Sequence, residues 1–205
     1  ALQVADAAQH AAGKLFIRHN RRYDPDFLQV QAIIASGILG EVFEIRLARH
    51  GYARRDDWQT LKQFAGGQLL NWGPHIIDHA LRFLDNQVVS QYSHLARVAA
   101  VGDAEDHVKI VLIGKNDRVV DLEISGGVAS GEPIYRVFGS RGSLTLAEDE
   151  IQLKYLDLTQ KLPERQANPG NPDDHFGTPE SLPWIEEIRP VQPGSNTVLW
   201  NYIYR

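Results

Sequence analysis

The 205 residues contain neither cysteine nor methionine. Without cysteine the chain can form no disulfide and use no thiol nucleophile, which is weakly compatible with a reducing compartment. Without methionine, Ala1 is not a natural start, so we expect the chain to be a piece of a longer protein. No apolar run approaches the roughly 18 residues that a membrane span needs. We therefore expect no membrane partner and a cytoplasmic location, unless a signal peptide precedes Ala1.

Clustered positive charge is also missing. The formal net charge is −5, and no basic run is longer than Arg21–Arg22 or Arg54–Arg55. A surface that binds nucleic acid or an anionic membrane gathers many more basic residues on one face. The sequence therefore predicts no nucleic-acid partner and a small-molecule ligand. A hydrophobic content of 43% is enough to build one core of ordinary size.

The sequence also lacks a glycine-rich loop that could bind phosphate. No G-x-G-x-x-G occurs, and the glycine pairs are Gly66–Gly67 and Gly126–Gly127. The Rossmann fold needs that loop, between a strand and a helix, to hold a dinucleotide's pyrophosphate. The chain is therefore not expected to bind a dinucleotide by itself.

Periodicity divides the chain into helices followed by strands. Residues 2–12 are alanine-rich and periodic, and residues 14–18 are predicted to be a buried strand; together they are typical of the last helix and strand of a Rossmann domain. Asp24 as N-cap with Pro25 after it opens a helix that ends at Gly37. A strand at 41–49 and a helix from Pro74 come next. Six alternating segments then follow, at 88–99, 107–113, 118–124, 134–138, 143–147 and 152–156.

The connections between those six segments are short, with turn signals in them. Short connections join antiparallel neighbours. The sequence therefore predicts an α+β domain, a mostly antiparallel open β-sheet with helices packed on one face. Alternate residues at 107–113 leave both faces partly apolar, and a lone solvated sheet would not tolerate this over a large area. We therefore expect the second face to be covered.

Proline dominates the far end of the chain. Residues 163–193 hold seven of the ten prolines, and we expect an extended loop there. Phe176, Leu182, Trp184 and Ile185 are expected to pack this loop across the domain surface. A flexible linker is the alternative.

Residues 66–85, GGQLLNWGPHIIDHALRFLD, bring glycines, a histidine and a carboxylate to the start of an amphipathic helix. Pro74 suits the first turn, so His75 lies there too. The positive end of the helix dipole disfavours imidazolium, and we expect His75 to be neutral and able to accept a proton. By itself, a histidine at such a position is more often a capping or packing residue. His75 and His79 with Asp78 between them also resemble an inverted zinc-binding motif, with an acid that is one methylene too short.

With these residues in view, the chain resembles the Gfo/Idh/MocA oxidoreductases (glucose-fructose oxidoreductase, inositol dehydrogenase and relatives). Their signature usually reads GG-x-L-x-D-x-G-x-H-x-x-D, close to residues 66–78. Further matches keep the family's order: HNRRYDP at 19–25, GILGEVFEIR at 37–46, Trp58, and YRVFGSRGSLTL at 135–146.

The resemblance implies a domain organisation. Residues 1–19 would be the remnant of a nucleotide-binding Rossmann domain, and residues 20–205 a C-terminal substrate-binding and oligomerisation domain, truncated at its end. It also implies that the absent domain holds NAD or NADP, that a homo-oligomer forms through the open sheet face, and that this fragment is inactive alone.

The resemblance makes His75 the catalytic residue that exchanges a substrate proton. The family's carboxylate four residues earlier is Asn71 here, which can orient His75 but cannot stabilise an imidazolium by charge. Asp78 either helps His75 or is a first-turn acid that pairs with Arg82. No metal ligand is expected, and a metal-dependent hydrolase or lyase using His75 and His79 is the weaker alternative.

Substrate contacts are expected at two places. Asn20, Arg21 and Arg22 follow the last Rossmann strand, and the carboxyl ends of such strands bind ligands; an interdomain salt bridge is the alternative. Arg49, His50 and Tyr52 end the strand at 41–49, which in the family faces the substrate. The resemblance thus implies an NAD(P)-dependent oxidoreductase acting on a sugar, cyclitol or related polyol. A non-catalytic sensor or partner domain and a cofactor-assisted glycosidase are the other hypotheses.

Overall fold

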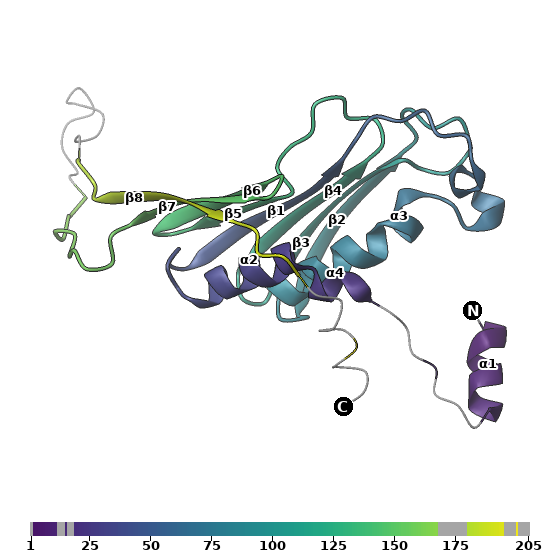
Figure 1. Cartoon of the computed structure of the whole chain (residues 1–205), viewed down its shortest axis with the longest axis horizontal. Coiled ribbons are helices and arrows are strands. Elements are labelled where there is room, and N and C mark those ends of the chain that lie inside the picture. Colours follow the sequence, from purple (N-terminus) through teal and green to yellow (C-terminus); the bar gives the residue numbers. More distant parts are fainter. Residues whose placement is uncertain (1, 12–14, 16–18, 168–179, 195–199, 201–205) are drawn as a thin grey trace.

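The structure, a computed structural model, describes residues 2–11, 15, 19–167, 180–194 and 200. One sheet dominates it, with helices beneath one of its faces (Figure 1). The helices are α1 (Leu2–His10), η1 (Asn20–Tyr23), α2 (Pro25–Ala35), η2 (Trp58–Thr60), η3 (Lys62–Phe64), α3 (Gln68–Asn71) and α4 (Gly73–Phe83), where η marks a 3₁₀ helix. The strands are β1 (Val42–His50), β2 (Val88–Ala96), β3 (His107–Gly114), β4 (Val119–Ser125), β5 (Tyr135–Gly139), β6 (Gly142–Ala147), β7 (Glu150–Leu156) and β8 (Trp184–Pro190).

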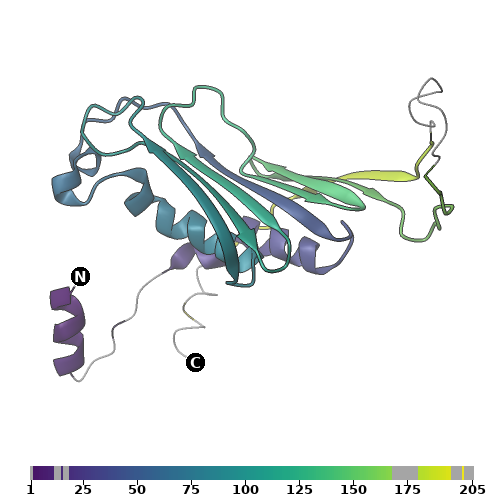
Figure 2. The same ribbon diagram turned by 180° about the vertical axis from the view of Figure 1, so that it is seen from behind.

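The eight strands form a single sheet in the order β2-β3-β4-β1-β5-β6-β7-β8. All neighbouring pairs are antiparallel except β1 and β4, which run parallel, with Leu47 opposite Leu122. The predicted fold class, a mostly antiparallel sheet with helices on one face, is confirmed. Views from opposite sides both place α2 and α4 beneath the sheet (Figures 1 and 2).

Local chemistry explains where the two long helices begin. Pro25 lies at the start of α2 and Pro74 at the start of α4, where the missing N–H leaves no bond unmade. Asp24 is the N-cap residue of α2 as predicted, but its side chain makes no capping hydrogen bond. Its carboxylate instead accepts a hydrogen bond from Arg21 Nη1 at 2.9 Å. That pair ties η1 to the start of α2.

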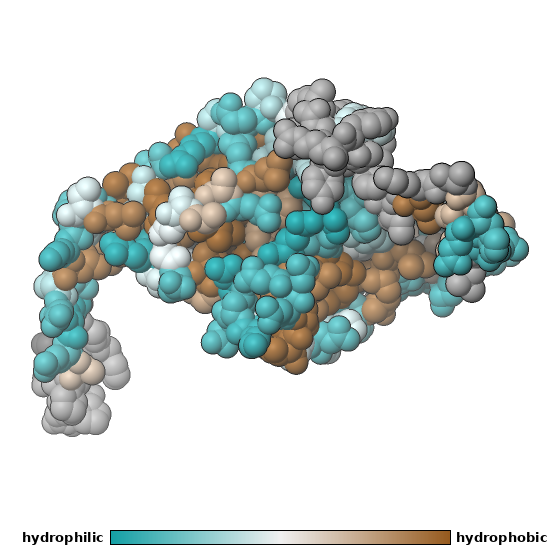
Figure 3. All heavy atoms as spheres, turned by 90° about the horizontal axis from the view of Figure 1, so that it is seen from below, coloured by the Kyte–Doolittle hydropathy of each residue, from teal (hydrophilic) through white to brown (hydrophobic). Residues whose placement is uncertain are grey.

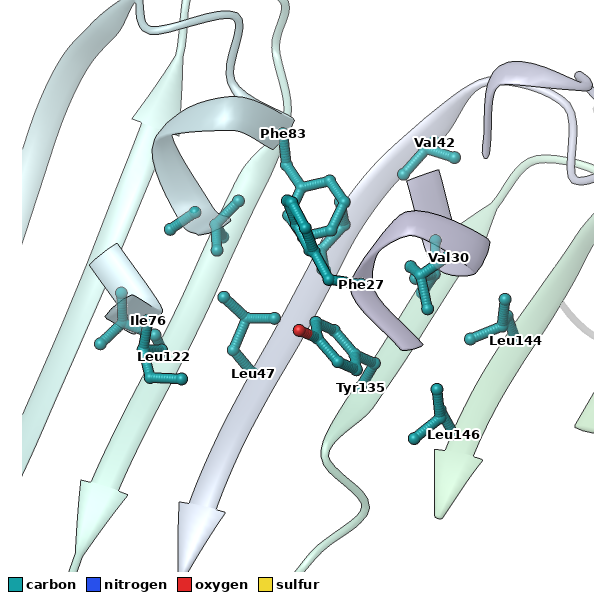
Figure 4. Close-up of a cluster of buried hydrophobic side chains, with 14 of the residues drawn as sticks. Phe27, Val30, Val42, Leu47, Ile76, Phe83, Leu122, Tyr135, Leu144 and Leu146 are labelled. Atoms are coloured by element: carbon teal, nitrogen blue, oxygen red, sulfur yellow. The ribbon is translucent and has the colours of Figure 1, made fainter. Parts of the chain in front are cut away.

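The hydrophobic core lies between the helices and the face of the sheet that they cover. Phe27 and Val30 of α2 are fully buried, as is Leu122 of β4 on the sheet side. Figure 4 shows side chains of both helices pointing onto the sheet between strands. Each such side chain contributes about 1.5–3 kcal/mol when removed from water. Burial of alternate residues along β3 and β4 fixes which face the helices cover.

The opposite face, called the open face here, is mixed in character. At its centre Lys109 Nζ lies 2.7 Å from Asp121 Oδ1 and 3.3 Å from Glu123 Oε2. Tyr92 on the edge strand β2 and Ile113 on β3 remain exposed. The open face therefore combines a charged cluster, formed by Lys109, Asp121 and Glu123, with exposed apolar side chains beside it.

The extended-loop prediction for residues 163–193 is wrong in one part. Trp184–Pro190 forms β8, an antiparallel edge strand on β7. Pro190 ends the strand, where a missing N–H is tolerated, and Pro183 precedes it. Phe176 lies outside the described residues.

The predicted Rossmann remnant is described only in part. Helix α1 covers residues 2–10 as expected and stands apart from the sheet in Figure 1. Of the strand predicted at 14–18, only Leu15 is among the described residues. Of the helices in the described part of the chain, none has the length and apolar character to cross a bilayer.

Candidate functional site

The segment at residues 66–85 forms a tight turn and the two consecutive helices α3 and α4, which lie against β3 and β4. Gly67 has φ +108°, and a Cβ there would come within 2.2 Å of Glu105 Oε1. A Cβ on Gly66 would meet the Gln59 carbonyl oxygen at 2.5 Å. Backbone packing against the protein itself therefore accounts for both glycines, with no ligand required.

His75 lies on the first turn of α4, as predicted. Its side chain is half-buried, and its Nδ1 is enclosed without a hydrogen-bond partner among the described residues. Burial, and then the electrostatic effect of the neighbouring Arg21, lower the pKa of His75. The imidazole is therefore neutral near pH 7, and burial is the largest cause.

Trp72, directly before α4, organises the surroundings of His75. The two rings meet edge to face, with their centroids 6.1 Å apart. Two guanidinium groups stack on the same indole: Arg49 Cζ lies 4.0 Å from the ring centroid and Arg21 Cζ 4.5 Å from it. Residues from η1, β1 and the start of α4 thus meet at one ring.

Asp78 is held by arginine. Arg22 donates two hydrogen bonds to it, from Nε to Oδ2 and from Nη2 to Oδ1, both 2.7 Å long. Arg82 Nε approaches Oδ2 at 3.4 Å, so the predicted i,i+4 pair is present as well. Burial alone would raise the pKa of Asp78, but the bonds and charge from Arg22 outweigh it and the pKa is lowered. Asp78 therefore joins η1 to α4 as a carboxylate.

Asn71 ends α3, four residues before His75. Its Nδ2 lies 3.4 Å from Gln59 Oε1, at the edge of a small hollow that Arg55, Glu105 and Asp106 also line. Asp106 is fully engaged there: its carboxylate accepts hydrogen bonds from the backbone N–H groups of residues 98, 99 and 100 at 2.6–2.9 Å. Those bonds outweigh burial and lower the pKa of Asp106.

The structure does not place the remaining predicted substrate contacts, His50, Tyr52 and Asn20, in contact with His75. His50 points to the open face, where its Nε2 lies 3.2 Å from Glu123 Oε1 and its Nδ1 accepts from the Glu132 N–H at 3.2 Å. Neighbouring residues of a strand face opposite sides, so Arg49 and His50 cannot share one pocket. Tyr52 is 61% exposed and forms an isolated bridge with Gly127. Asn20 lies in η1 beside Arg21 and Arg22.

His79 is a buried histidine with hydrogen-bond partners, the role that its place among the apolar positions of α4 favours over metal binding. It is 3% exposed and stacks on Phe27, with ring centroids 3.9 Å apart. Its Nε2 lies 2.9 Å from the Arg21 carbonyl oxygen, which can only accept, so Nε2 carries the proton. Nδ1 therefore accepts from the Tyr135 hydroxyl, also at 2.9 Å.

Burial lowers the pKa of His79, which keeps the ring neutral. Both ring nitrogens of His79 are hydrogen-bonded, so His79 has no nitrogen left to bind a metal ion together with His75. The described residues contain no group of three or more histidine, cysteine, aspartate or glutamate side chains placed to hold a metal ion. The sequence reasoning did not predict the role of Trp72 or the pairing of His79 with Tyr135, which lies 56 residues away in the chain.

An open, mostly antiparallel sheet with helices on one face, and a histidine on the first turn of one of those helices, define an α+β domain with a candidate proton-transfer residue. The profile of the GFO/IDH/MocA C-terminal domain matches residues 27–145, and the chain belongs to that family. The family predicted from residues 66–85 is thereby confirmed.

Individual relatives agree with this assignment. The chain is 30% identical over 193 residues to uncharacterized oxidoreductase YdgJ of Escherichia coli K12, covering 93% of this chain and 55% of that protein. Over 77 residues it is 32% identical to IolW of Bacillus subtilis 168, a scyllo-inositol 2-dehydrogenase (NADP(+)), covering 37% of this chain and 22% of IolW. A solved NAD-binding protein from Listeria innocua shares the fold, with a TM-score of 0.73 at 20% identity, covering 99% of this chain and 61% of the other. The chain spans about half the length of the curated relatives it matches.

Proposed function

We propose that this chain is the substrate-binding C-terminal domain of an NAD(P)-dependent oxidoreductase that acts on a sugar, cyclitol or related polyol. The observation that carries the proposal is His75: a neutral histidine on the first turn of α4, inside the family motif and beside Trp72. The dehydrogenase activity named for the relative IolW supports the substrate class.

The chemistry assigned to this chain is proton transfer. When a carbinol is oxidised, the hydroxyl proton must go to a base, and a neutral imidazole is suited to take it near pH 7. In the reverse direction the same ring returns the proton to the carbonyl oxygen. Arg21 and Arg49, stacked on Trp72, supply N–H donors to oxygen atoms of the substrate.

The nicotinamide cofactor is assigned to a domain outside this chain. A dinucleotide's phosphates need glycines that leave backbone N–H groups open to the ligand. Gly66 and Gly67 do not offer this, because their Cα positions are closed off by Gln59 and Glu105. The cofactor supplies the hydride acceptor or donor, and the residues described here bind the substrate and move the proton.

Turnover by the full-length protein tests the proposal. NAD(P)H absorbance would be followed with a panel of sugars, inositols and their keto forms, for wild type, His75→Ala and a control, His10→Ala, which changes an exposed histidine of α1. We expect His75→Ala to lower kcat by about 10²- to 10⁴-fold and the control to leave it unchanged. The 205-residue chain alone should show no turnover.

A non-catalytic sensor or partner domain is the second candidate, because Asn71 replaces the family's acid and bonds Gln59 instead. Unchanged function in His75→Ala would favour it over the oxidoreductase. Tight cofactor binding without turnover on any alcohol would favour either the sensor or a cofactor-assisted glycosidase.

We also propose that a second copy of the protein covers the open face. Exposed Tyr92 and Ile113 beside the charged centre suit an interface that is apolar with a few ion pairs. Ile113→Asp should shift the full-length protein to a smaller species in light scattering. A wild-type monomer at micromolar concentration would contradict the proposal.

A further inference from the structure

The charges around His75 do not balance. Arg21 pairs with Asp24 at 2.9 Å, and Arg22 pairs with Asp78 at 2.7 Å. Arg49 is different: in the part of the chain that the structure describes, its guanidinium contacts the Trp72 ring and no carboxylate. An exposed, uncompensated cation thus lies beside the proposed base.

Stacking on Trp72 also fixes the orientation of the Arg49 guanidinium toward a ligand. A guanidinium on an indole face keeps the N–H donors in its own plane free, pointing past the edge of the ring. Two parallel N–H groups in that plane match the two oxygens of a carboxylate or phosphate. Because the side chain is already held by Trp72, less rotamer entropy is lost when an anion binds.

Both neighbours of Trp72 strengthen this arrangement. Arg21 stacks on the same ring at 4.5 Å and adds positive charge, while the His75 ring meets the indole edge at 6.1 Å. A ligand that reaches Arg49 would therefore extend across one indole to the imidazole. That span suits a small molecule with an anionic group at one end and a hydroxyl at the other.

We propose that the substrate is an anionic polyol, one whose carboxylate or phosphate binds Arg49 on Trp72 while the reacting hydroxyl lies against His75. The inference rests on the proposed function and narrows its substrate class. A neutral sugar would gain only ordinary hydrogen bonds from Arg49. An anion would gain a charge-assisted bidentate pair, which corresponds to an advantage on the order of 10- to 100-fold in kcat/KM.

The test compares matched substrates on the full-length protein: a neutral polyol, the sugar acid derived from it, and its phosphate ester. We expect wild type to prefer an anionic member by about tenfold or more, and the preferred member identifies the group as carboxylate or phosphate. Arg49→Gln should abolish this preference. The control Lys115→Gln removes one positive charge from the β3–β4 turn, at the opposite end of the strands from Arg49, and should keep the preference.

Two results would overturn the inference while the proposed function stands. One is equal kcat/KM for neutral and anionic members with no effect of Arg49→Gln. The other is an Arg49→Gln effect confined to the KM for NAD(P), which would assign the guanidinium to a cofactor phosphate.

Calorimetric titration of the same acids and esters keeps the inference testable without turnover. Wild type should bind the anionic member at least tenfold more tightly than Arg49→Gln does, and equal binding by the two proteins would overturn it. Loss of turnover on every substrate, with no cofactor binding, would instead contradict the proposed function.

Discussion

Replacing His79 with leucine should lower the free energy of unfolding by about 2–5 kcal/mol. The change leaves the Tyr135 hydroxyl without its partner, and Tyr135 is only 2% exposed. The Arg21 carbonyl loses the hydrogen bond from His79 and keeps the one from the Asp24 N–H at 3.2 Å. Each buried polar group left unpaired costs about 1–3 kcal/mol. Loss of the stack on Phe27 removes about 0.5–1.5 kcal/mol more, and the apolar leucine restores part of the total.

Urea denaturation of wild type, His79→Leu, Tyr135→Phe and the double variant measures this directly. Tyr135→Phe alone should cost about 1–2 kcal/mol, because His79 Nδ1 then lacks a donor. In the double variant the unpaired hydroxyl is gone, so its loss should be about 1 kcal/mol smaller than the sum of the single losses. Losses that add to within about 0.5 kcal/mol would refute the assigned hydrogen bond.

Three further predictions concern charge. Asn71→Asp places a carboxylate four residues before His75 and should raise the pKa of that histidine, which an NMR titration of the imidazole would show; an unmoved pKa would mean that the two side chains do not interact. Asp106→Asn removes a charged acceptor of three backbone N–H groups and should cost about 1.5–3 kcal/mol at pH 7. Its effect on stability should fade as pH falls below about 4, because the contribution of a carboxyl with a lowered pKa is present above the unfolded value and is lost on protonation. His75 and His79 both have lowered pKa values in the folded protein, so the unfolded chain takes up protons first as pH drops below about 6.5. The free energy of unfolding should therefore fall with pH in that range. His79→Leu should make this fall less steep, which urea titrations at pH 5–8 would measure.

Local sequence patterns were enough to predict most helices and strands. They failed where a strand depends on pairing with a segment that is distant along the chain. The helix from Pro25 and the strands at 107–124 follow from periodicity and turn residues alone. Strand β8 could not be found this way, because its proline-rich surroundings resemble a loop and only the ladder with β7 makes it a strand. The parallel pairing of β1 with β4 likewise joins segments far apart in the chain, which no local pattern encodes.

The candidate site could also be predicted only in part. The motif placed His75 on the first turn of its helix, and this needed only Pro74 and the apolar spacing after it. The partners of Asp78 and Asn71 were not predictable, because Arg22 is 56 residues from Asp78 and Gln59 is 12 residues from Asn71. Strand alternation could have separated His50 from Arg49 in advance, since adjacent strand residues face opposite sides.

The central place of β1 has a consequence for how the chain folds. Strands β2-β3-β4 and β5-β6-β7 are each a run of neighbouring antiparallel pairs with short connections, which can form early because their contacts are local. Strand β8 extends the second run by pairing with β7 across a longer connection. Strand β1 precedes both runs in sequence yet lies between β4 and β5, and it alone joins them. We therefore expect the closing of the long loops from β1 to its two partners to be the slow step of folding. Before that step, the two half-sheets would have unpaired edges. A destabilising change in β1 should slow refolding more than an equal change in β7, and the exposed edges of β4 and β5 are where the unfinished chain is most prone to aggregate.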